Sequence, residues 1–234
     1  RNASWRRGVP AEDKAKWDRL LNWRLYREYS GGLMAELACH QFDTINWFLG
    51  APPISVQGIA GLDWYKDGRD VWDNVHVIYT YPDGVKVTYE SLCTNAFDGE
   101  GCYFYGKEGT LCLSEGGGSL YREQSAEKLA WADMAHTEKD ARGHTAVVLN
   151  AGATTKADKR ERTAGVALAG GNSQNQNNYF LEFLDFFEVV RHPEQKKPFA
   201  DALTGLEVAA TVLRANDAME KGMIYRFKKE DFTA

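Results

Sequence analysis

The clearest pattern of hydrophobic and polar positions lies between residues 33 and 49. At about 100° of rotation per residue, apolar side chains recur along one side of a helix at Met34, Ala38, Phe42, Ile45 and Leu49. The opposite side carries Glu36, His40 and Asp43, together with Trp47. The pattern predicts an amphipathic helix that buries its apolar side and points the acid and histidine side chains outward.

A strand-rich block follows this helix. Residues 54–64 have the composition of a strand. Residues 75–81 and 85–90 alternate apolar and polar positions on either side of Asp83-Gly84, a strong hairpin signal. Two more short strands are predicted at 102–106 and 110–114. Because consecutive strands are joined by tight turns, the block indicates a mostly antiparallel sheet.

Helices are predicted on both sides of the strand block. Pro10 and the acidic residues after it predict a helix that ends near Leu21. Helical spacing recurs over residues 179–191 and 203–219, and Gly222 ends the second run. Residues 224–227 are predicted to form a final edge strand.

These elements define an α+β class. We expect one open, mostly antiparallel sheet with helices on one face, in a single domain over residues 1–234. Residues 132–178 are poor in aromatic side chains and rich in Ala, Gly, Thr and Asn, so we expect a long loop or a partly ordered insertion.

Composition excludes several classes of partner. The 234 residues carry a formal net charge of -5 with acids and bases interleaved, which argues against nucleic acid. No apolar run has the length of a membrane span. The four cysteines, at positions 39, 93, 102 and 112, lack metal-ligand spacing and are predicted to be buried free thiols. We expect no metal, membrane or nucleic acid to bind.

The pair of Glu36 and His40 has two interpretations. An acid and a histidine four residues apart are common on exposed helix faces and usually carry no function. Trp47 on the same outward stripe favours a covered site instead. Imidazole titrates near neutral pH, which suits a general base, while Asp43 either orients a substrate or supports the helix.

The chain resembles the C-terminal domain of the Gfo/Idh/MocA oxidoreductases, the glucose–fructose oxidoreductase and inositol dehydrogenase family. The run from Gly31 to Asp43 is similar to the GGxxxDxxxHxxD helix of that family, with Glu36 in place of its usual Asp. Residues 105–111, YGKEGTL, are similar to its G-x-x-G-T-L hairpin. Further similarity lies in Trp47, Gly50, Pro52, Pro53, Pro198, Asp201, Gly205 and Leu206.

The resemblance implies site residues. It implies that His40 is the catalytic base or orients the substrate, and that Glu36 holds the imidazole ring in one tautomer. Because sugar binding requires flat apolar faces and polar groups, the candidate substrate-binding residues are Asp43, Trp5, Arg6, Trp23, Arg24, Tyr26, Tyr65 and Lys66. Taken singly, each of them can also be a half-buried aromatic or a solvated charge.

The resemblance also implies NAD or NADP in the full-length protein. This sequence has neither the G-x-G-x-x-G turn that binds a dinucleotide nor the family's catalytic lysine motif. We therefore expect the chain to be a segment of a longer protein, without its N-terminal dinucleotide-binding domain, and to bind no cofactor and to be inactive by itself. A cytoplasmic location is expected, with the periplasm as the alternative.

Three functions are compatible with these observations. The first is the substrate-binding and dimerisation domain of an NAD(P)-dependent oxidoreductase that acts on a sugar or polyol hydroxyl. The second is an NAD-dependent glycoside hydrolase or lyase that works through transient oxidation. The third is a non-catalytic module that binds carbohydrate or dimerises. In the family the open sheet face carries a subunit interface, which implies a homo-oligomer.

Overall fold

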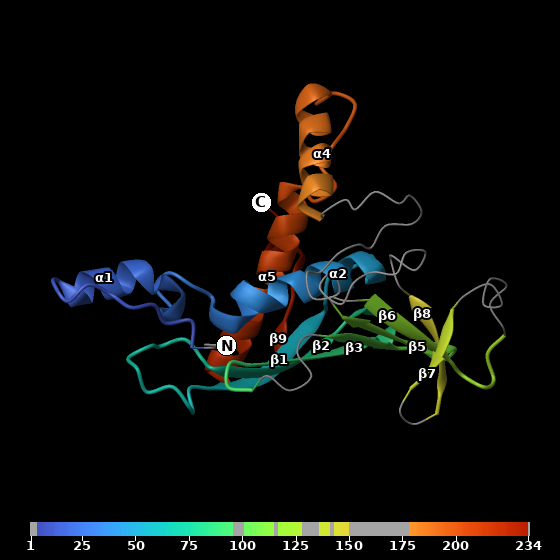
Figure 1. The fold of residues 1–234 in the computed structure, drawn as a ribbon, viewed down its shortest axis with the longest axis horizontal. Coiled ribbons are helices and arrows are strands. Elements are labelled where there is room, and N and C mark those ends of the chain that lie inside the picture. The colour runs from blue at the N-terminus through green and yellow to red at the C-terminus, as the bar shows by residue number, and fades with distance from the viewer. Residues whose placement is uncertain are drawn as a thin grey trace. The chain divides into compact units, whose positions relative to one another are not determined.

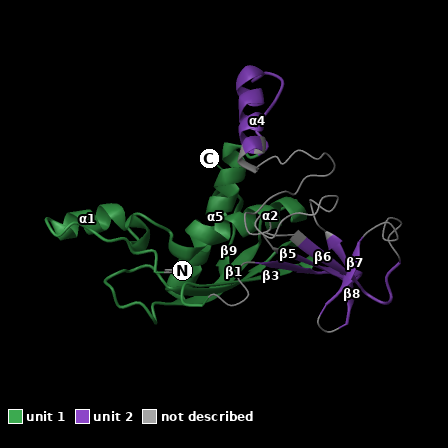
Figure 2. Ribbon diagram, viewed as in Figure 1, with its two compact units in different colours: residues 1–96, 200–234 green, residues 97–199 purple. Residues whose placement is uncertain are grey.

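The computed structural model describes residues 4–95, 101–114, 117–127, 136–140, 143–149 and 178–233 (Figure 1). They fall into two compact units, residues 1–96 with 200–234 and residues 97–199 (Figure 2). The single domain expected from the sequence stays a prediction. Within the described residues every strand pair is antiparallel, and four α-helices accompany the strands, which confirms the α+β class.

The first unit contains a four-stranded sheet. Its strand order is β3-β2-β1-β9, with β1 at Ser55–Gly61, β2 at Asn74–Thr80, β3 at Lys86–Leu92 and β9 at Tyr225–Arg226. Asp83 and Gly84 both adopt positive φ in the turn between β2 and β3, as the hairpin signal predicts. The sheet's inward face carries fully buried side chains at Val56, Val75, Val77 and Tyr79.

Two helices cover that face, α2 at Cys39–Leu49 and α5 at Ala202–Lys221 (Figure 1). The Phe42 ring packs 4.3 Å from the Tyr79 ring, centroid to centroid. The hydroxyl of Tyr79 donates to the carbonyl of Thr211 at 3.1 Å, so the buried phenol is satisfied by the backbone of α5. The opposite face leaves Ile59, Ile78 and Leu92 exposed.

Shorter helices precede and follow this core. Helix α1 covers Lys14–Leu21, and single helical turns lie at Trp23–Leu25 and Lys229–Phe232. The side chain of Asp201 caps α5 by accepting from the amides of Leu203 and Thr204. Helix α1 ends at Leu21, and Gly222 is the C-cap of α5, so both predicted helix ends are confirmed.

The second unit holds a separate five-stranded sheet, so the strands form two sheets where one was expected. Its order is β4-β5-β6-β8-β7. The bounds are Cys102–Tyr105 for β4, Gly109–Ser114 for β5, Gly117–Arg122 for β6, Thr137–Lys139 for β7 and Thr145–Leu149 for β8. Helix α4, at Asn178–Arg191, belongs to the same unit.

The segment expected to be a loop or partly ordered insertion contains β7 and β8. The β-branched run TAVVL of β8 pairs with both β6 and β7, so strand pairing outweighs the loop-like composition of residues 132–178. Residues 128–135, 141–142 and 150–177 lie outside the described residues. All four cysteines are free thiols, with Cys93 buried and the other three half-buried.

Candidate functional site

The helix with the acid–histidine stripe begins at a tight bend. Gly32 has a φ of 62°, a conformation that favours glycine, and its amide donates to the Ser30 hydroxyl at 3.0 Å. A Cβ at Gly31 would lie 2.6 Å from the Ala35 Cβ, so only glycine fits there. The bend therefore brings Ser30 close to the first turn of the helix.

The first turns of this helix are π-helical, over Met34–Ala38, before α2 continues the helix. A turn closed by i→i+5 bonds holds more residues than the 3.6 of an α-helix. Positions four apart therefore stay on one side, and Met34, Ala38 and Phe42 are all 0% exposed. The predicted apolar side is confirmed at these positions, and π-turns of this kind are frequent at functional sites.

The predicted polar stripe faces outward. His40, Asp43 and Trp47 are exposed, whereas Glu36 is half-buried. The carboxylate of Glu36 accepts from the Nε of Arg24 at 2.8 Å and from the hydroxyl of Ser30 at 3.2 Å. Within the part of the chain that the structure describes, Glu36 makes no hydrogen bond to the His40 ring. Its carboxylate extends back toward the helix start, as helical side chains do.

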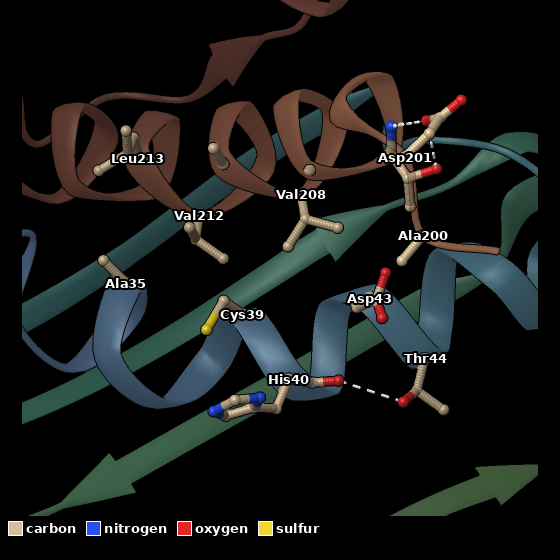
Figure 3. Close-up of a pocket in the computed structure, with 13 residues that line it drawn as sticks. Ala35, Cys39, His40, Asp43, Thr44, Ala200, Asp201, Val208, Val212 and Leu213 are labelled. Carbon is tan, nitrogen blue, oxygen red and sulfur yellow. Dashed lines mark hydrogen bonds between the residues drawn. The ribbon is translucent and has the colours of Figure 1, made fainter. Parts of the chain in front are cut away.

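A groove with a volume of about 710 Å³ lies between α2 and α5 (Figure 3). One wall carries Cys39, His40, Asp43 and Thr44, and the other carries the apolar side chains Val208, Val212 and Leu213 (Figure 3). The Asp43 carboxylate points toward Ala200, whereas the His40 ring extends away from α5 at the rim (Figure 3). The volume of the groove and its lining of polar and apolar side chains are typical of a small-molecule site.

The protonation of Cys39 limits what this groove can do chemically. Burial raises the pKa of the Cys39 thiol, and the nearby carboxylates of Glu36 and Asp43 act in the same direction. The thiol is therefore protonated at neutral pH and is a poor nucleophile. His40 is the lining side chain of the type that most often serves as a general acid or base in catalysis.

Two predicted substrate-binding residues are part of an ionic network at the N-terminal segment. The Arg6 guanidinium binds Asp18 at 2.6 Å and Asp67 at 2.8 Å. The Tyr26 hydroxyl donates to the same Asp18 carboxylate. Because Arg69, whose side chain is 1% exposed, also binds Asp67, the network ties the segment around Arg6 to the loop after β1.

Other predicted residues also have partners outside the groove. The Tyr65 ring packs against the Arg69 guanidinium at 4.0 Å, and Lys66 donates to the Leu62 carbonyl at 2.8 Å. Trp5 is half-buried with a φ of 57°. The groove is thus lined by His40 and Asp43 of the predicted set, and not by Glu36, Trp5, Arg6, Trp23, Arg24, Tyr26, Tyr65 or Lys66.

The sequence analysis assigned no role in the site to the α5 wall. Spacing in residues 203–219 predicted a helix, and Asp201 was noted only as part of a family pattern. Glu207, also on α5, does not line the groove, but the charge of Asp43 acts on its carboxyl. Burial raises its pKa, the side chain of Asn46 opposes the rise, and the charge of Asp43 adds to it.

Clusters of metal-ligating side chains and membrane-spanning helices are both absent from the described residues. No cluster of three or more His, Cys, Asp or Glu side chains there could hold a metal ion. None of the helices in the same ranges combines the length and apolar character of a membrane span.

Comparison with known proteins gives a family match. Residues 2–112 match the family model described as the GFO/IDH/MocA C-terminal domain. The protein YteT of Bacillus subtilis (strain 168), which is named as an oxidoreductase, is 40% identical over 43 residues. That match covers 18% of this chain and 10% of YteT.

Several solved structures share the fold at low identity. Levoglucosan dehydrogenase in complex with NADH has a TM-score of 0.62 at 15% identity, over 88% of this chain and 53% of that one. Aldose-aldose oxidoreductase from Caulobacter crescentus, complexed with glycerol, has a TM-score of 0.57 at 14% identity, over 88% and 50%. The chain therefore spans about half the length of the solved structures it matches.

Proposed function

Since residues 2–112 belong to the Gfo/Idh/MocA C-terminal domain family, we propose that this chain is the substrate-binding domain of an oxidoreductase that acts on a sugar or polyol hydroxyl. The observation that carries the proposal is the groove in which His40 and Asp43 of the family's motif helix face solvent. Relatives of the same fold are named as acting on an aldose and on levoglucosan, which supports this substrate class.

Oxidation of an alcohol to a carbonyl removes a proton from oxygen and a hydride from carbon. In our proposal the His40 imidazole accepts the proton, because histidine is the side chain that most often serves as a general base and His40 lies at the rim of the groove. Asp43 accepts a hydrogen bond from a neighbouring hydroxyl of the substrate. Glu36, with its oxygens bound to Arg24 and Ser30, supports the imidazolium by its charge and not by a direct hydrogen bond.

The glycine pair at the start of the motif helix does not have the form of a dinucleotide-binding turn. The Gly31-Gly32 pair precedes a helix but lacks the third glycine of the G-x-G-x-x-G turn. The Ser30 hydroxyl accepts the Gly32 amide there, so that donor is already used. We therefore propose that NAD or NADP binds to a separate dinucleotide-binding segment of the full-length protein, and that the hydride acceptor comes from there.

The test is His40→Ala in the full-length protein from the source gene, assayed with NAD⁺ and NADP⁺ on a panel of sugars and polyols. We expect kcat to fall about 100-fold or more, as for loss of a general base. His192→Ala, on an exposed residue after α4, is the matched control and should leave kcat unchanged. Unchanged turnover in His40→Ala would remove His40 from the chemistry. Cleavage of an intact glycoside without net reduction of the cofactor would favour a glycosidase instead.

We also propose that the open face of the four-stranded sheet forms a homo-oligomer interface. Strands β1, β2 and β3 pair in full register, so their outward side chains form one continuous surface. Ile59 is 72% exposed, and Ile78 and Leu92 are each 44% exposed on that face. Large apolar side chains exposed on one sheet face favour a protein–protein contact there.

A further inference from the structure

A second hollow, separate from the groove, lies against α1. Its volume is about 590 Å³, within the range of small-molecule pockets. Six residues from the first unit line it: Ala15, Lys16, Arg19, Leu20, Trp23 and Tyr29. None of them lines the groove at His40, so the proposed catalytic function does not account for this hollow.

The walls of the hollow are aromatic and open to solvent. Trp23 is 40% exposed and Tyr29 is 49% exposed, and Leu20 beside them is 59% exposed. Three large side chains of the lining, all within ten residues of sequence, are thus exposed to solvent. Flat aromatic faces with a polar edge suit a ligand that has an apolar ring face and hydroxyl groups at its rim.

The Trp23 ring contacts Arg24, which in turn binds Glu36 in the helix that carries His40. The Arg24 guanidinium lies 5.1 Å from the Trp23 ring centroid. The Nε of the same Arg24 binds Glu36 at 2.8 Å. The Trp23 ring therefore contacts the guanidinium that binds Glu36, and Glu36 lies one turn before His40. These contacts orient the ring and preorganise this wall of the hollow.

The charge of the lining is positive. Lys16 and Arg19 are its charged members, and no acidic side chain lines the hollow. Arg19 is already bound to Glu28 at 2.9 Å. Lys16 lies 5.9 Å from the Trp17 ring and forms no ion pair with the described residues. The lining thus contains one cation, Lys16, that forms no ion pair with the described residues, together with the rings of Trp23 and Tyr29, which fits an anionic group on the ligand.

We propose that this hollow binds a sugar ring that carries a carboxylate, such as a hexuronate. The apolar face of the ring packs on Trp23 and Tyr29, and the carboxylate binds Lys16. The preference for an anion follows from the lining charges alone, whereas the choice of a sugar also rests on the proposed function. Because the hollow and the groove share no residue, the two assignments can fail separately.

The experiment is a titration of the 234-residue chain with D-glucuronate and D-glucose, followed by NMR chemical shifts of the indole and Lys16 side-chain signals. We expect D-glucuronate to bind about three- to fivefold tighter at low salt, which is the strength of one exposed ion pair. Lys16→Gln should remove that preference and leave glucose binding unchanged. Lys14→Gln, a lysine of α1 outside the lining, is the matched control and should change nothing.

Trp23→Leu should weaken the binding of both sugars at the hollow, as followed by the Lys16 side-chain signals. Equal binding of glucose and glucuronate, or equal effects of Lys16→Gln and Lys14→Gln, would overturn the anion assignment. Benzoate binding as tightly as glucuronate would overturn the sugar assignment. Loss of turnover in His40→Ala with no sugar bound at Trp23 would refute this proposal and leave the catalytic one intact.

Discussion

Glu36 is the residue whose local geometry matters most for the proposed chemistry. It lies one turn before His40, yet its two oxygens bind Arg24 and Ser30. Arg24 is about half exposed, so the pair is partly screened by water and its strength is that of a surface ion pair. The consequence is that the negative charge near His40 is shared with a guanidinium.

A double-mutant cycle tests this arrangement. Arg24→Ala and Glu36→Ala should couple by about 0.5–1 kcal/mol in the free energy of unfolding. The matched cycle of His40→Ala with Glu36→Ala should show weaker coupling, because those side chains interact only through charge and make no hydrogen bond. Urea denaturation of the single and double variants measures both. Strong coupling between Glu36 and His40 would show that the carboxylate orients the imidazole directly.

Asp73 gives a pH-dependent prediction at the same scale. Its side chain is buried, which opposes ionisation, but hydrogen bonds from the Tyr65 amide, the Asn74 side chain and the Trp64 amide outweigh burial and lower its pKa. A lowered pKa in the folded state stabilises the fold above the unfolded value of about 3.9. That contribution is lost as the pH falls through the folded pKa.

Asp73→Asn should therefore lower the free energy of unfolding at pH 7 by about 2 kcal/mol, since charged hydrogen bonds are replaced by weaker ones. It should also make the decline of stability below pH 4 shallower. Urea unfolding at a series of pH values measures both effects. Glu12→Gln, at an exposed residue, is the control. An acid decline as steep as in the unmodified chain would show that other carboxylates dominate.

At the scale of single residues, the sequence predicted which side chains face outward better than it predicted which residues they bind. The periodicity of residues 33–49 predicted that His40 and Asp43 face outward, and both are exposed. It could not predict that Arg24 binds Glu36, because that contact depends on the bend at Gly31-Gly32 and not on helical spacing. It also missed the π-turn, which an assumed 100° rotation cannot reveal.

At the scale of elements, α2 is fixed by the apolar side that its π-helical start keeps aligned. Phe42 is fully buried and contacts the rings of Tyr79 and Tyr89, at 4.3 Å and 5.7 Å between centroids. This aromatic contact joins α2 to β2 and β3. The position of His40 therefore depends on a ring on the opposite side of its own helix.

Phe42→Ala should lower the free energy of unfolding by about 3–5 kcal/mol, because the cavity lies in the packed core between helix and sheet. Phe48→Ala removes the same atoms from a side chain that is 54% exposed, and should cost less than about 1 kcal/mol. Thermal or urea unfolding of both variants tests this. Similar losses in the two would show that the interior of the first unit is not packed around Phe42.

The sequence predicted strands correctly where apolar and polar residues alternate clearly. The alternation in residues 75–81 and 85–90 predicted β2, β3 and the turn at Asp83-Gly84. It failed for β6 and β7, where glycines and charged residues obscure strand periodicity, and for the short run TAVVL of β8. Strand β8 pairs with β6 across a long intervening segment, and local sequence signals do not specify such a pairing.

At the scale of the whole molecule, the division of strands between two sheets was not predictable from the sequence. Tight turns predict which strands are neighbours, and β1–β2–β3 and β4–β5–β6 follow chain order in that way. Where a sheet ends depends on long-range pairing, as when β9 returns to the edge of β1. The family resemblance supplied the class of fold, but not this boundary.

The oligomeric state is the remaining property of the whole molecule that the structure makes testable. Ile59 and Ile78 lie on the open face of the sheet, opposite the face that α2 and α5 cover. In water an exposed apolar surface gains free energy by burial, at about 25 cal/mol per Å² removed from solvent. A second copy of the same face would bury both isoleucines symmetrically about a two-fold axis. We therefore expect a dimer in sedimentation velocity at micromolar concentration.

Ile78→Glu should shift that dimer to monomer, because pairing across a two-fold axis would bury two unpaired carboxylates. Leu203→Glu introduces the same charge at a 62% exposed position of α5, away from the open face, and should leave the dimer intact. Circular dichroism of both variants checks that the fold is retained. A monomer in the unmodified chain, or dissociation by Leu203→Glu as readily as by Ile78→Glu, would assign the contact to another surface. Because His40 lies on the helix-covered side, dissociation by Ile78→Glu should leave sugar binding in the groove unchanged.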